Sequence, residues 1–439
     1  MKHYRFGEKS LVRTSQYGNN LGQEYIVKTN SKGRIFISYR RLEHRIAEAV
    51  LVRDTLRDRG IPTWRDLDNL ESKPTEEQLI QILNDQNTSG AIMLIAKEVR
   101  DSTMIRNVEA PRIFNRFNKK DGFIVKPVLT GIGYQEANDI LNAPAGFQDL
   151  GNWNLHKLGN DSVTLEDARM VANDVLKARL NEVSNQYSDE AIDLRIYTRS
   201  VSNPDLNTLV HDFSNYFNGR EPVSGAFEKI EFALKDTARA ISLTRGEANI
   251  SAGGFASLPT GVLFGAIFSP LRKFKVSWAQ SLVGHDEIDW SLCMKPSPME
   301  LDIKKCLGDT SSIDVVLALG ISANIEHAVT DYLNANVINP RCSIYVQLPI
   351  GPLKQGVSLT PAEGLSIALQ SVDAVRFAKD DLMLNRINLH LFLACPLALA
   401  VLLGQKLNTV STCFLYEHTP TGEQNYDKVH TFSPSDISY

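Results

Sequence analysis

Arg34-Ile35-Phe36-Ile37-Ser38-Tyr39-Arg40-Arg41 is an apolar run that ends in a polar turn, and the fold of the first part of the chain follows from it. The next residues, 42–59, place apolar side chains at helical spacing, and Gly60 is a natural helix stop. Strands that alternate with helices in this way predict a parallel sheet covered on both faces. The same pattern predicts strands at 61–64, 91–96 and 122–129 and helices at 75–84 and 165–180.

The composition indicates a globular protein of more than one domain. The chain has 439 residues, of which 43% are hydrophobic and 22% are charged. A net charge of -4 gives no argument for DNA or an anionic membrane, so we expect neither partner. The five cysteines form no C-x-x-C pair, which predicts free thiols in a reducing compartment and no metal site. Because no apolar stretch follows Met1, we expect no secretory signal and a cytoplasmic location.

The most apolar stretch, 389–403, has to be weighed as a membrane span. It is shorter than the roughly 20 residues that a spanning helix needs. His390 and Pro396 also interrupt it. A buried strand that leads into a buried helix is therefore the expected structure.

The later part of the chain repeats a strand–turn–helix unit. Residues 1–32 are a polar arm, and 181–190 form a polar linker without periodicity. After the linker, 191–439 divides into two similar halves, about 191–300 and 301–439. The first strands are Ile192–Tyr197, leading to a helix opened by Asn203-Pro204, and Ile313–Leu319, leading to a helix at 323–334. A second repeated pair is an apolar segment at 259–268 before a strand at 273–278, and another at 396–404 before a strand at 409–416.

A glutamate follows the first set of strands, in a recognisable order of motifs. After the opening strand come Arg59-Gly60-Ile61-Pro62-Thr63-Trp64-Arg65-Asp66, the apolar run 90–95, and Ser102-Thr103-Met104-Ile105-Arg106-Asn107-Val108-Glu109. Residues 33–180 resemble a TIR domain, which implies a flavodoxin-like parallel sheet. In the enzymatic members of that family, the glutamate cleaves NAD. Met104 and Ile105 replace the family's Trp-Cys pair, the spacing from Ser102 is one residue longer, and Pro111 follows the glutamate.

The chemistry of Glu109 can be argued from the residue itself. Cleavage of the bond between nicotinamide and ribose develops positive charge on the sugar, and a carboxylate stabilises that charge. Because proline is tolerated in the first turn of a helix, Pro111 predicts that Glu109 opens a helix whose dipole favours the ionised form. The alternative is a surface glutamate in a first helical turn. The candidate substrate contacts are Ser38, Tyr39, Arg40, Trp64 and Asp66, of which the first three end a strand, where open parallel sheets bind ligands.

The segments Leu317–Asn324, His390–Pro396 and Phe414–His418 resemble those of the SAVED domain. That family consists of two fused CARF-like, Rossmann-like halves and senses cyclic oligonucleotides. Two strand–turn–helix units offer two helix N-termini to the phosphates of such a ring. The candidate ligand contacts are Arg199, Ser200, Gly253, Gly254, Lys273, Gly320, Ser322, Asn324 and His390. The alternative for each of them is helix capping or plain surface.

Together, the two resemblances imply a TIR–SAVED effector of CBASS-type antiphage defence. We expect a NAD+ hydrolase that needs no cofactor and that a cyclic oligonucleotide activates, with a cyclic tri-adenylate among the candidate ligands. Activation is expected to involve self-association into oligomers or filaments, in which neighbouring TIR domains complete each other's active sites. Two alternatives stay open. The TIR domain is a non-catalytic scaffold, or it makes a cyclic ADP-ribose second messenger.

Overall fold

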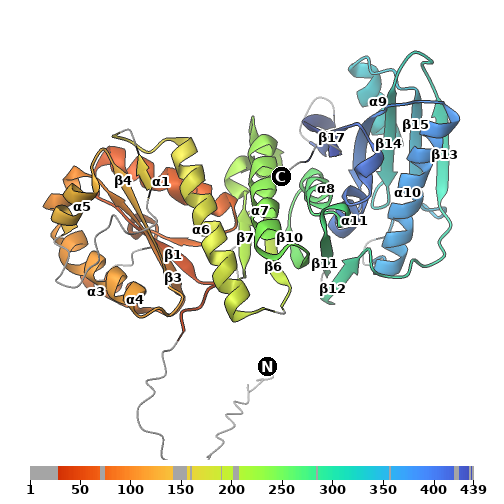
Figure 1. The fold of residues 1–439 in the computed structure, drawn as a ribbon. Helices are drawn as coiled ribbons and strands as arrows, with labels where there is room; N and C mark the ends of the chain where they lie inside the picture. Colours follow the sequence, from red (N-terminus) through yellow and green to blue (C-terminus); the bar gives the residue numbers. More distant parts are fainter. Residues whose placement is uncertain are drawn as a thin grey trace, which may run out of the picture.

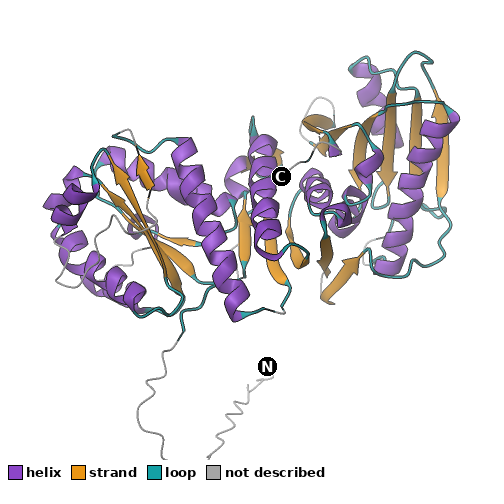
Figure 2. Ribbon diagram, in the orientation of Figure 1, coloured by secondary structure: helices purple, strands orange, loops and turns teal. Residues whose placement is uncertain are grey.

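A computed structural model describes residues 28–69, 75–141, 156–158, 161–188, 190–200, 207–282, 285–354, 357–419, 425–434 and 437. Its strands form three main sheets that follow one another along the chain (Figure 1). Helices cover both faces of the first sheet (Figure 2). The structure is therefore of the α/β class, as the sequence predicts.

The first sheet contains five parallel strands in the order β2-β1-β3-β4-β5. Alternate residues of β1 face opposite sides. Ile35 and Ile37 pack with α1 and α6, and Phe36 packs with α3, α4 and α5. The predicted strand 34–38 and helix 75–84 are confirmed to the residue. The elements are β1 (Arg34–Ser38), α1 (Glu43–Asp58), β2 (Thr63–Trp64), α2 (Asp66–Asn69), α3 (Thr75–Asn84), β3 (Thr88–Ile95), a 3-10 turn (Lys97–Asp101), a π-helical turn (Ile105–Glu109), α4 (Ala110–Asn118), β4 (Ile124–Thr130), α5 (Tyr134–Leu141), β5 (His156–Leu158) and α6 (Leu165–Gln186).

The second sheet has the order β12-β11-β10-β6-β7, so its first strand again lies inside the sheet. Only β12 is antiparallel to its neighbour. The apolar segment at 259–268 lies mostly in the buried helix α8. The elements are β6 (Ile192–Tyr197), β7 (Leu209–Asp212), the short hairpin β8 (Phe217–Asn218) and β9 (Glu221–Pro222), α7 (Ala226–Arg245), β10 (Ala248–Phe255), α8 (Leu258–Ile267), β11 (Phe274–Leu282) and β12 (His285–Ser291).

The third sheet repeats this arrangement in the order β13-β15-β14-β16-β17-β18. Its parallel strands are β14 to β17, and β18 returns antiparallel beside β17, as β12 does beside β11. Strand β13 adds an antiparallel edge. The elements are β13 (Asp302–Leu307), β14 (Asp314–Gly320), α9 (Glu326–Ala335), β15 (Cys342–Gln347), α10 (Pro361–Asp381), β16 (Asn388–Ala394), α11 (Leu397–Gly404), β17 (Thr412–His418) and β18 (Tyr426–Phe432).

Helices α8 and α11 occupy equivalent places after the third parallel strand of their sheets, and they pack against each other. Gly265 and Gly404 allow the close approach, because an added Cβ would lie 2.2 Å from the carbonyl oxygen of Val401 and of Val262, respectively. The stretch 389–403 is thus a buried strand followed by a buried helix, as predicted. Among the described helices, none has the length and apolar character that a membrane crossing requires.

The expected linker and the expected polar arm have different boundaries in the structure. Helix α6 continues to Gln186, into the segment expected as a linker, because Val183 is buried and Gln186 donates to the carbonyl of Thr29. The expected polar arm ends earlier than residue 32, since Thr29 and Ser31 are buried. The predicted helix at Asn203-Pro204 lies outside the described residues.

Helix α6 joins the first two sheets. It packs on α1 and β4 on one side and on α7 on the other, as Figure 1 shows. Its fully buried Arg179 donates to the carbonyls of Gly33 and Thr208, at 2.6 and 2.7 Å. The same side chain therefore holds the chain just before β1 and the chain just before β7.

Candidate functional site

The first sheet has a topological switch point between β1 and β3. The chain leaves β1 for β2 on one side and then returns to β3 on the other, and open sheets of this order bind ligands at such a crevice. Ser38 is the last residue of β1. Its Oγ donates a hydrogen bond of 2.6 Å to Oε2 of Glu109, which follows β3. Two of the predicted site residues therefore meet where the topology favours a ligand.

The predicted place of Glu109 in its helix is wrong. The chain becomes helical at Thr103, where the Ser102 hydroxyl accepts the N–H of Ile105 at 3.3 Å, so Glu109 does not lie in the first turn. It ends a π-helical turn, a local widening that is frequent at functional sites. Pro111 is tolerated because the regular hydrogen-bond pattern is already interrupted there. A helix dipole does not, therefore, account for the charge state of Glu109.

The environment of Glu109 favours the neutral form of its carboxyl more strongly than an exposed position would. The side chain is buried, and this burial raises its pKa to about 7. The Ser38 hydrogen bond and the charge of Arg41 lower the pKa, whereas the charge of Asp66 raises it. Near neutral pH, the neutral form of Glu109 is therefore more populated than it would be in an exposed carboxyl. Perturbed carboxyls of this kind are characteristic of functional sites.

Asp66 forms a small hydrogen-bonded group beside Glu109. The Tyr39 hydroxyl donates to its Oδ1 at 2.6 Å, and Arg41 forms an ion pair with its other oxygen. Tyr39 is buried, and burial together with Asp66 raises the pKa of its hydroxyl far above the usual range. Tyr39 and Asp66 thus hold each other in place at the end of β1. Arg41, which the sequence reasoning did not select, completes the group.

Trp64 and Arg40 differ in what they offer to a ligand. The ring of Trp64 is buried and stacks on Phe36, with ring centres 5.2 Å apart, so it is part of the core and not a platform for a substrate ring. The half-buried Arg40 lies one residue further along the chain than Tyr39, and its Nε has no hydrogen-bond partner among the described residues. Of these two, Arg40 is the candidate for a phosphate contact.

Two cavities in the N-terminal unit lie away from Glu109. They have volumes of about 540 and 280 Å³. Both are lined by the first residues of β4 and by residues 174–182 of α6. They therefore lie at the amino edge of the sheet, opposite the edge where Ser38 meets Glu109.

The second sheet has its switch point between β6 and β10, and a cavity of about 600 Å³ lies at the end of β6. The described residues that line it include three arginines and no acidic residue, so the cavity attracts anions. The lining residues are Arg57, Thr198, Arg199, Ser200, Ser214, Asn215, Phe217, Gly219 and Arg220. Arg199 and Ser200 were predicted from the sequence. Arg57 and Arg220 were missed, because each lies on a different element and neither belongs to a local motif.

Gly253 and Gly254 lie near the same edge, but the reason for glycine there is strand packing. Gly254 has a φ of +129°, and an added Cβ would lie 2.2 Å from the carbonyl oxygen of Ile196 in β6. At Gly253 an added Cβ would lie 2.8 Å from Nη1 of Arg195. These glycines therefore let β10 lie close to β6, and they shape the edge of the sheet.

Glu417, in the third sheet, interacts electrostatically with arginines of this cavity. It lies in β17 with an Oε2 that is buried and without a hydrogen-bond partner among the described residues. Burial raises its pKa to about 7, while the Ser257 hydroxyl and the charges of Arg199 and Arg220 lower it. The charges of two arginines of the first half thus act on a carboxyl of the second.

The matching edge of the third sheet is already hydrogen-bonded. The N–H groups of Ile321 and Ser322 both donate to the carbonyl of Ala394, at 2.9 and 2.8 Å. The Asn324 side chain accepts the N–H of Glu326 at 3.1 Å, at the start of α9. Helix α9 begins at Glu326 and not at 323, since Asn324 caps it. The backbone of Ser322 and the side chain of Asn324 thus shape and cap the turn, while ligand contact by Gly320, Ser322 and Asn324 stays a prediction.

Two predicted ligand contacts, His390 and Lys273, lie away from the carboxyl edges of their sheets. His390 is buried near the start of β16, where its Nδ1 bonds the Tyr416 hydroxyl at 2.7 Å, and burial lowers its pKa. Lys273 has a left-handed φ of 64° just before β11, at the amino edge of the second sheet. The sheets thus place neither side chain at the edge where the cavity lies, and their contact with a ligand stays a prediction.

Comparison with known proteins identifies the later part of the chain. Residues 233–432 match the model of the SAVED family, "SMODS-associated and fused to various effectors sensor domain". Similar solved structures include the Acinetobacter baumannii Cap4 SAVED/CARF-domain containing receptor with the cyclic trinucleotide 3'3'3'-cAAA (13% identity, 83% of this chain and 87% of that chain, TM-score 0.46). The Moraxella osloensis Cap4 receptor is also similar (12% identity, 82% and 86% of the two chains, TM-score 0.40). No curated protein matches the chain significantly. The C-terminal part of this chain therefore contains a SAVED domain.

Proposed function

We propose that the protein is a NAD+ glycohydrolase that a cyclic oligonucleotide activates. The observation that carries the catalytic part is the hydrogen bond between Ser38 and Glu109 at the switch point of the first sheet. The order of the five parallel strands is also the order expected of the TIR domain that this segment resembles. A buried carboxyl, once ionised, acts strongly on positive charge that develops beside it, because little water screens it.

In the proposed reaction the bond between C1′ of the ribose and the nicotinamide nitrogen breaks, and its electron pair leaves with nicotinamide. Ionised Glu109 stabilises the positive charge that develops on the sugar. Water then adds at C1′ and loses one proton, which gives ADP-ribose, nicotinamide and H+. Ser38 holds the carboxylate through its hydroxyl, and Arg40 is the candidate contact for the pyrophosphate.

The sensing part of the proposal rests on the SAVED match and on the basic cavity beside β6. A cyclic oligonucleotide carries one negative charge per phosphate, and arginine binds phosphate with two parallel hydrogen bonds. Arg199 and Arg220 would receive phosphates, while Ser200 and Asn215 offer further polar contacts. The charges of Arg199 and Arg220 act on Glu417 of β17, so the cavity is coupled electrostatically to the third sheet.

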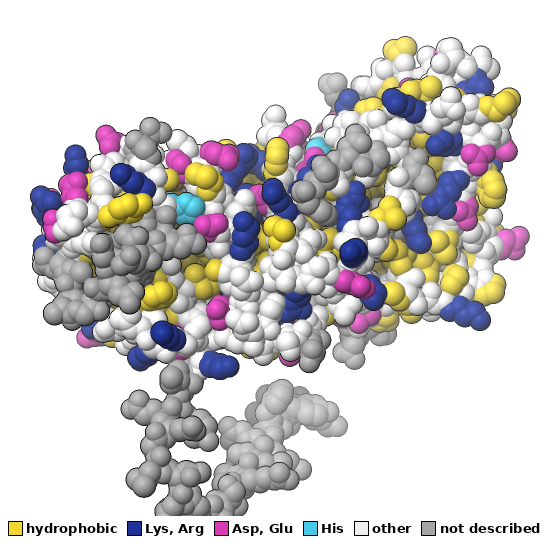
Figure 3. Space-filling view, in the orientation of Figure 1, with side chains coloured by type: hydrophobic (Ala, Val, Ile, Leu, Met, Phe, Trp, Pro, Cys, Tyr) yellow, Lys and Arg dark blue, Asp and Glu magenta, His cyan; other side chains and the backbone are white. Residues whose placement is uncertain are grey.

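We further propose that ligand binding promotes self-association in the cytoplasm, and that loss of NAD then serves antiphage defence. Joining of two N-terminal units would complete each active site and keep a single molecule inactive. The charge distribution agrees with a small-molecule ligand. On the face drawn in Figure 3, Lys and Arg side chains are interspersed with Asp and Glu and form no broad basic surface of the kind that DNA binding uses.

The test is NAD consumption by the purified protein, alone and with a panel of cyclic di-, tri- and tetranucleotides. We expect consumption with one ligand and none with Glu109→Ala. Glu166→Ala is the matched control, because Glu166 is an exposed residue in the first turn of α6. Equal rates in the wild type and in Glu109→Ala would overturn the catalytic proposal.

The two alternatives predict different results in the same assay. A non-catalytic scaffold, which the replacement of the family's Trp-Cys pair by Met104 and Ile105 favours, would bind ligand and self-associate without loss of NAD. An enzyme that makes cyclic ADP-ribose would consume NAD but yield a cyclic product. Chromatography of the products separates this activity from hydrolysis.

A further inference from the structure

One arginine of the basic cavity comes from the N-terminal unit, the part of the chain that forms the first sheet. Arg57 lies in the last turn of α1, a helix that covers the first sheet. Its side chain nevertheless lines the cavity together with Arg199 and Arg220. The N-terminal unit therefore supplies part of the wall of the cavity in which we place the ligand.

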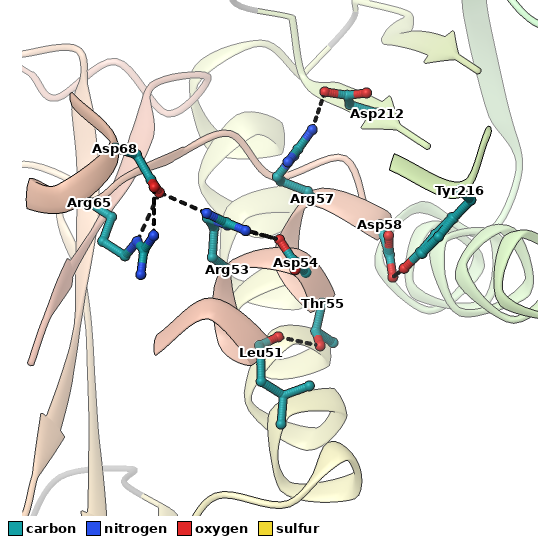
Figure 4. A network of polar contacts seen from close by, with 10 residues as sticks. All are labelled: Leu51, Arg53, Asp54, Thr55, Arg57, Asp58, Arg65, Asp68, Asp212 and Tyr216. Atoms are coloured by element: carbon teal, nitrogen blue, oxygen red, sulfur yellow. Dashed lines mark hydrogen bonds and ion pairs between the residues drawn. The ribbon is translucent and has the colours of Figure 1, made fainter. Parts of the chain in front are cut away.

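At present Arg57 has an acidic partner, which Figure 4 shows. Its guanidinium forms an ion pair with Asp212, the last residue of β7. The side chains are 29% and 30% exposed, so both are within reach of a ligand. Asp212 also accepts the N–H and the hydroxyl of Ser214, at 3.1 and 2.6 Å, so Asp212 stays in place if Arg57 leaves.

We propose that Arg57 is a ligand-binding residue of the sensor, and that a phosphate of the ligand replaces Asp212 as its partner. The inference rests on the proposed sensing function and names the residue through which the N-terminal unit takes part in it. Arginine suits this exchange, because its planar donors match phosphate as well as carboxylate. The two other cavity arginines add to the attraction for an anion.

The position of Arg57 connects the cavity to the candidate active site. One turn earlier on α1, Arg53 forms an ion pair of 3.0 Å with Asp68 in α2 (Figure 4). Asp68 also pairs with Arg65, at 2.5 Å. Helix α2 begins with Asp66, whose charge acts on Glu109. A shift of α1 on ligand binding would thus reach the segment beside Glu109 through contacts that exist in the structure.

Several other contacts also hold the end of α1 against the second sheet. A shift of α1 would therefore have to begin at a contact that the ligand can reach. The Tyr216 hydroxyl donates to Asp58 at 2.7 Å, and Val210 donates its N–H to the carbonyl of Gly60 at 2.7 Å. Arg59 forms an ion pair with Asp236 of α7. Among these residues at the end of α1, Arg57 is the one whose side chain lines the cavity.

The experiment compares two variants that break the same ion pair from opposite sides. We would measure, by calorimetry, the binding of each member of the panel of cyclic di-, tri- and tetranucleotides, including 3'3'3'-cAAA. Arg57→Ala removes the proposed phosphate contact, and we expect affinity to fall about 10- to 100-fold. Asp212→Asn releases Arg57 to the ligand, and we expect the affinity to stay equal or to rise. Arg53→Ala, on the same helix but outside the cavity, should bind as the wild type does.

The outcomes separate this inference from the proposed function. If the wild type binds a ligand and Arg57→Ala binds it equally well, Arg57 is not a contact and the sensing proposal stands. If Arg57→Ala and Asp212→Asn weaken binding to the same extent, the pair only holds the interface, and the inference is overturned. If the wild type binds no member of the panel, the sensing function falls and the inference falls with it. Arg57→Gln guards against loss of folding, because it keeps a donor without the charge and should fall between the wild type and Arg57→Ala.

Discussion

The Ser38 hydroxyl donates a 2.6 Å hydrogen bond to Glu109, 71 residues further along the chain. This bond and burial act on the carboxyl in opposite directions. Burial favours the neutral acid, whereas a donated hydrogen bond favours the carboxylate. The pKa of about 7 is the result of this opposition, and it sets the pH range over which Glu109 changes charge.

Replacement of Ser38 by alanine should move the activity to higher pH. Without the donor the carboxylate is less stable, so the pKa of Glu109 rises above about 7. A hydrogen bond to a charged group contributes about 1.5–3 kcal/mol, which corresponds to roughly one to two pH units. The measurement is the rate of NAD loss against pH for the activated protein. Ser38→Thr keeps a hydroxyl and should retain the wild-type profile, and an unshifted acid limb in Ser38→Ala would contradict the prediction.

Glu109→Gln should stabilise the protein at alkaline pH. The folded-state pKa is raised from 4.5 to about 7, so between these values the folded protein binds a proton more tightly than the unfolded chain. The stability of the wild type therefore falls as pH rises through this window, by about 3 kcal/mol in all. Glutamine does not ionise, so the variant should unfold at a higher temperature than the wild type at pH 8 and at a similar temperature at pH 4. A difference in melting temperature that is the same at both pH values would count against a buried, titrating Glu109.

Glu417 should make ligand binding depend on pH. Its pKa is about 7, and the charges of Arg199 and Arg220 act on it. Above pH 7 the carboxylate competes with ligand phosphates for these arginines and repels them, so affinity should fall as pH rises. Glu417→Gln should remove this dependence, with the largest gain in affinity at pH 8. Binding of the activating ligand by calorimetry at pH 6 and pH 8 provides the test, and parallel pH profiles for the two proteins would refute it.

Arg179 should be among the most sensitive positions for stability. It is fully buried and donates to the carbonyls of Lys32, Gly33, Asn207 and Thr208. Arg179→Met leaves these carbonyls without their donor, and we expect a loss of about 3–5 kcal/mol. Arg179→Lys keeps the charge but cannot span four carbonyls, so it should lose only part of this stability. Thermal unfolding measures both, and a melting temperature of Arg179→Met equal to that of the wild type would exclude this role.

Elements with a strong local pattern could be predicted from the sequence. The strand 34–38 and the helix 75–84 are examples, because their apolar spacing and the residues at their ends specify them locally. For the helix that contains Glu109, Pro111 predicts a start that is too late, because proline is typical of a first helical turn. Ser102, a common N-cap residue, is the better signal.

Side chains whose surroundings depend on strand pairing could not be predicted in the same way. His390 pairs with Val316 and therefore lies deep in the third sheet, among aromatic rings, although its motif suggested a ligand contact. Arg57 shows the opposite case. Nothing near it in the sequence suggests a ligand, because its role depends on the docking of α1 against β7.

The packing of helix α6 limits which N-terminal units can be joined to this sensor. Its 22 residues pack on the first sheet with one side and on α7 with the other. The two units therefore share this helix and are not joined by a flexible linker. Exchange of the N-terminal unit for an unrelated one would remove that helix and expose α7. A transplanted unit must therefore bring a helix with a matching apolar face, together with a substitute for Arg179. Engineered fusions of this sensor should begin upstream of Leu165, so that the whole helix is carried along.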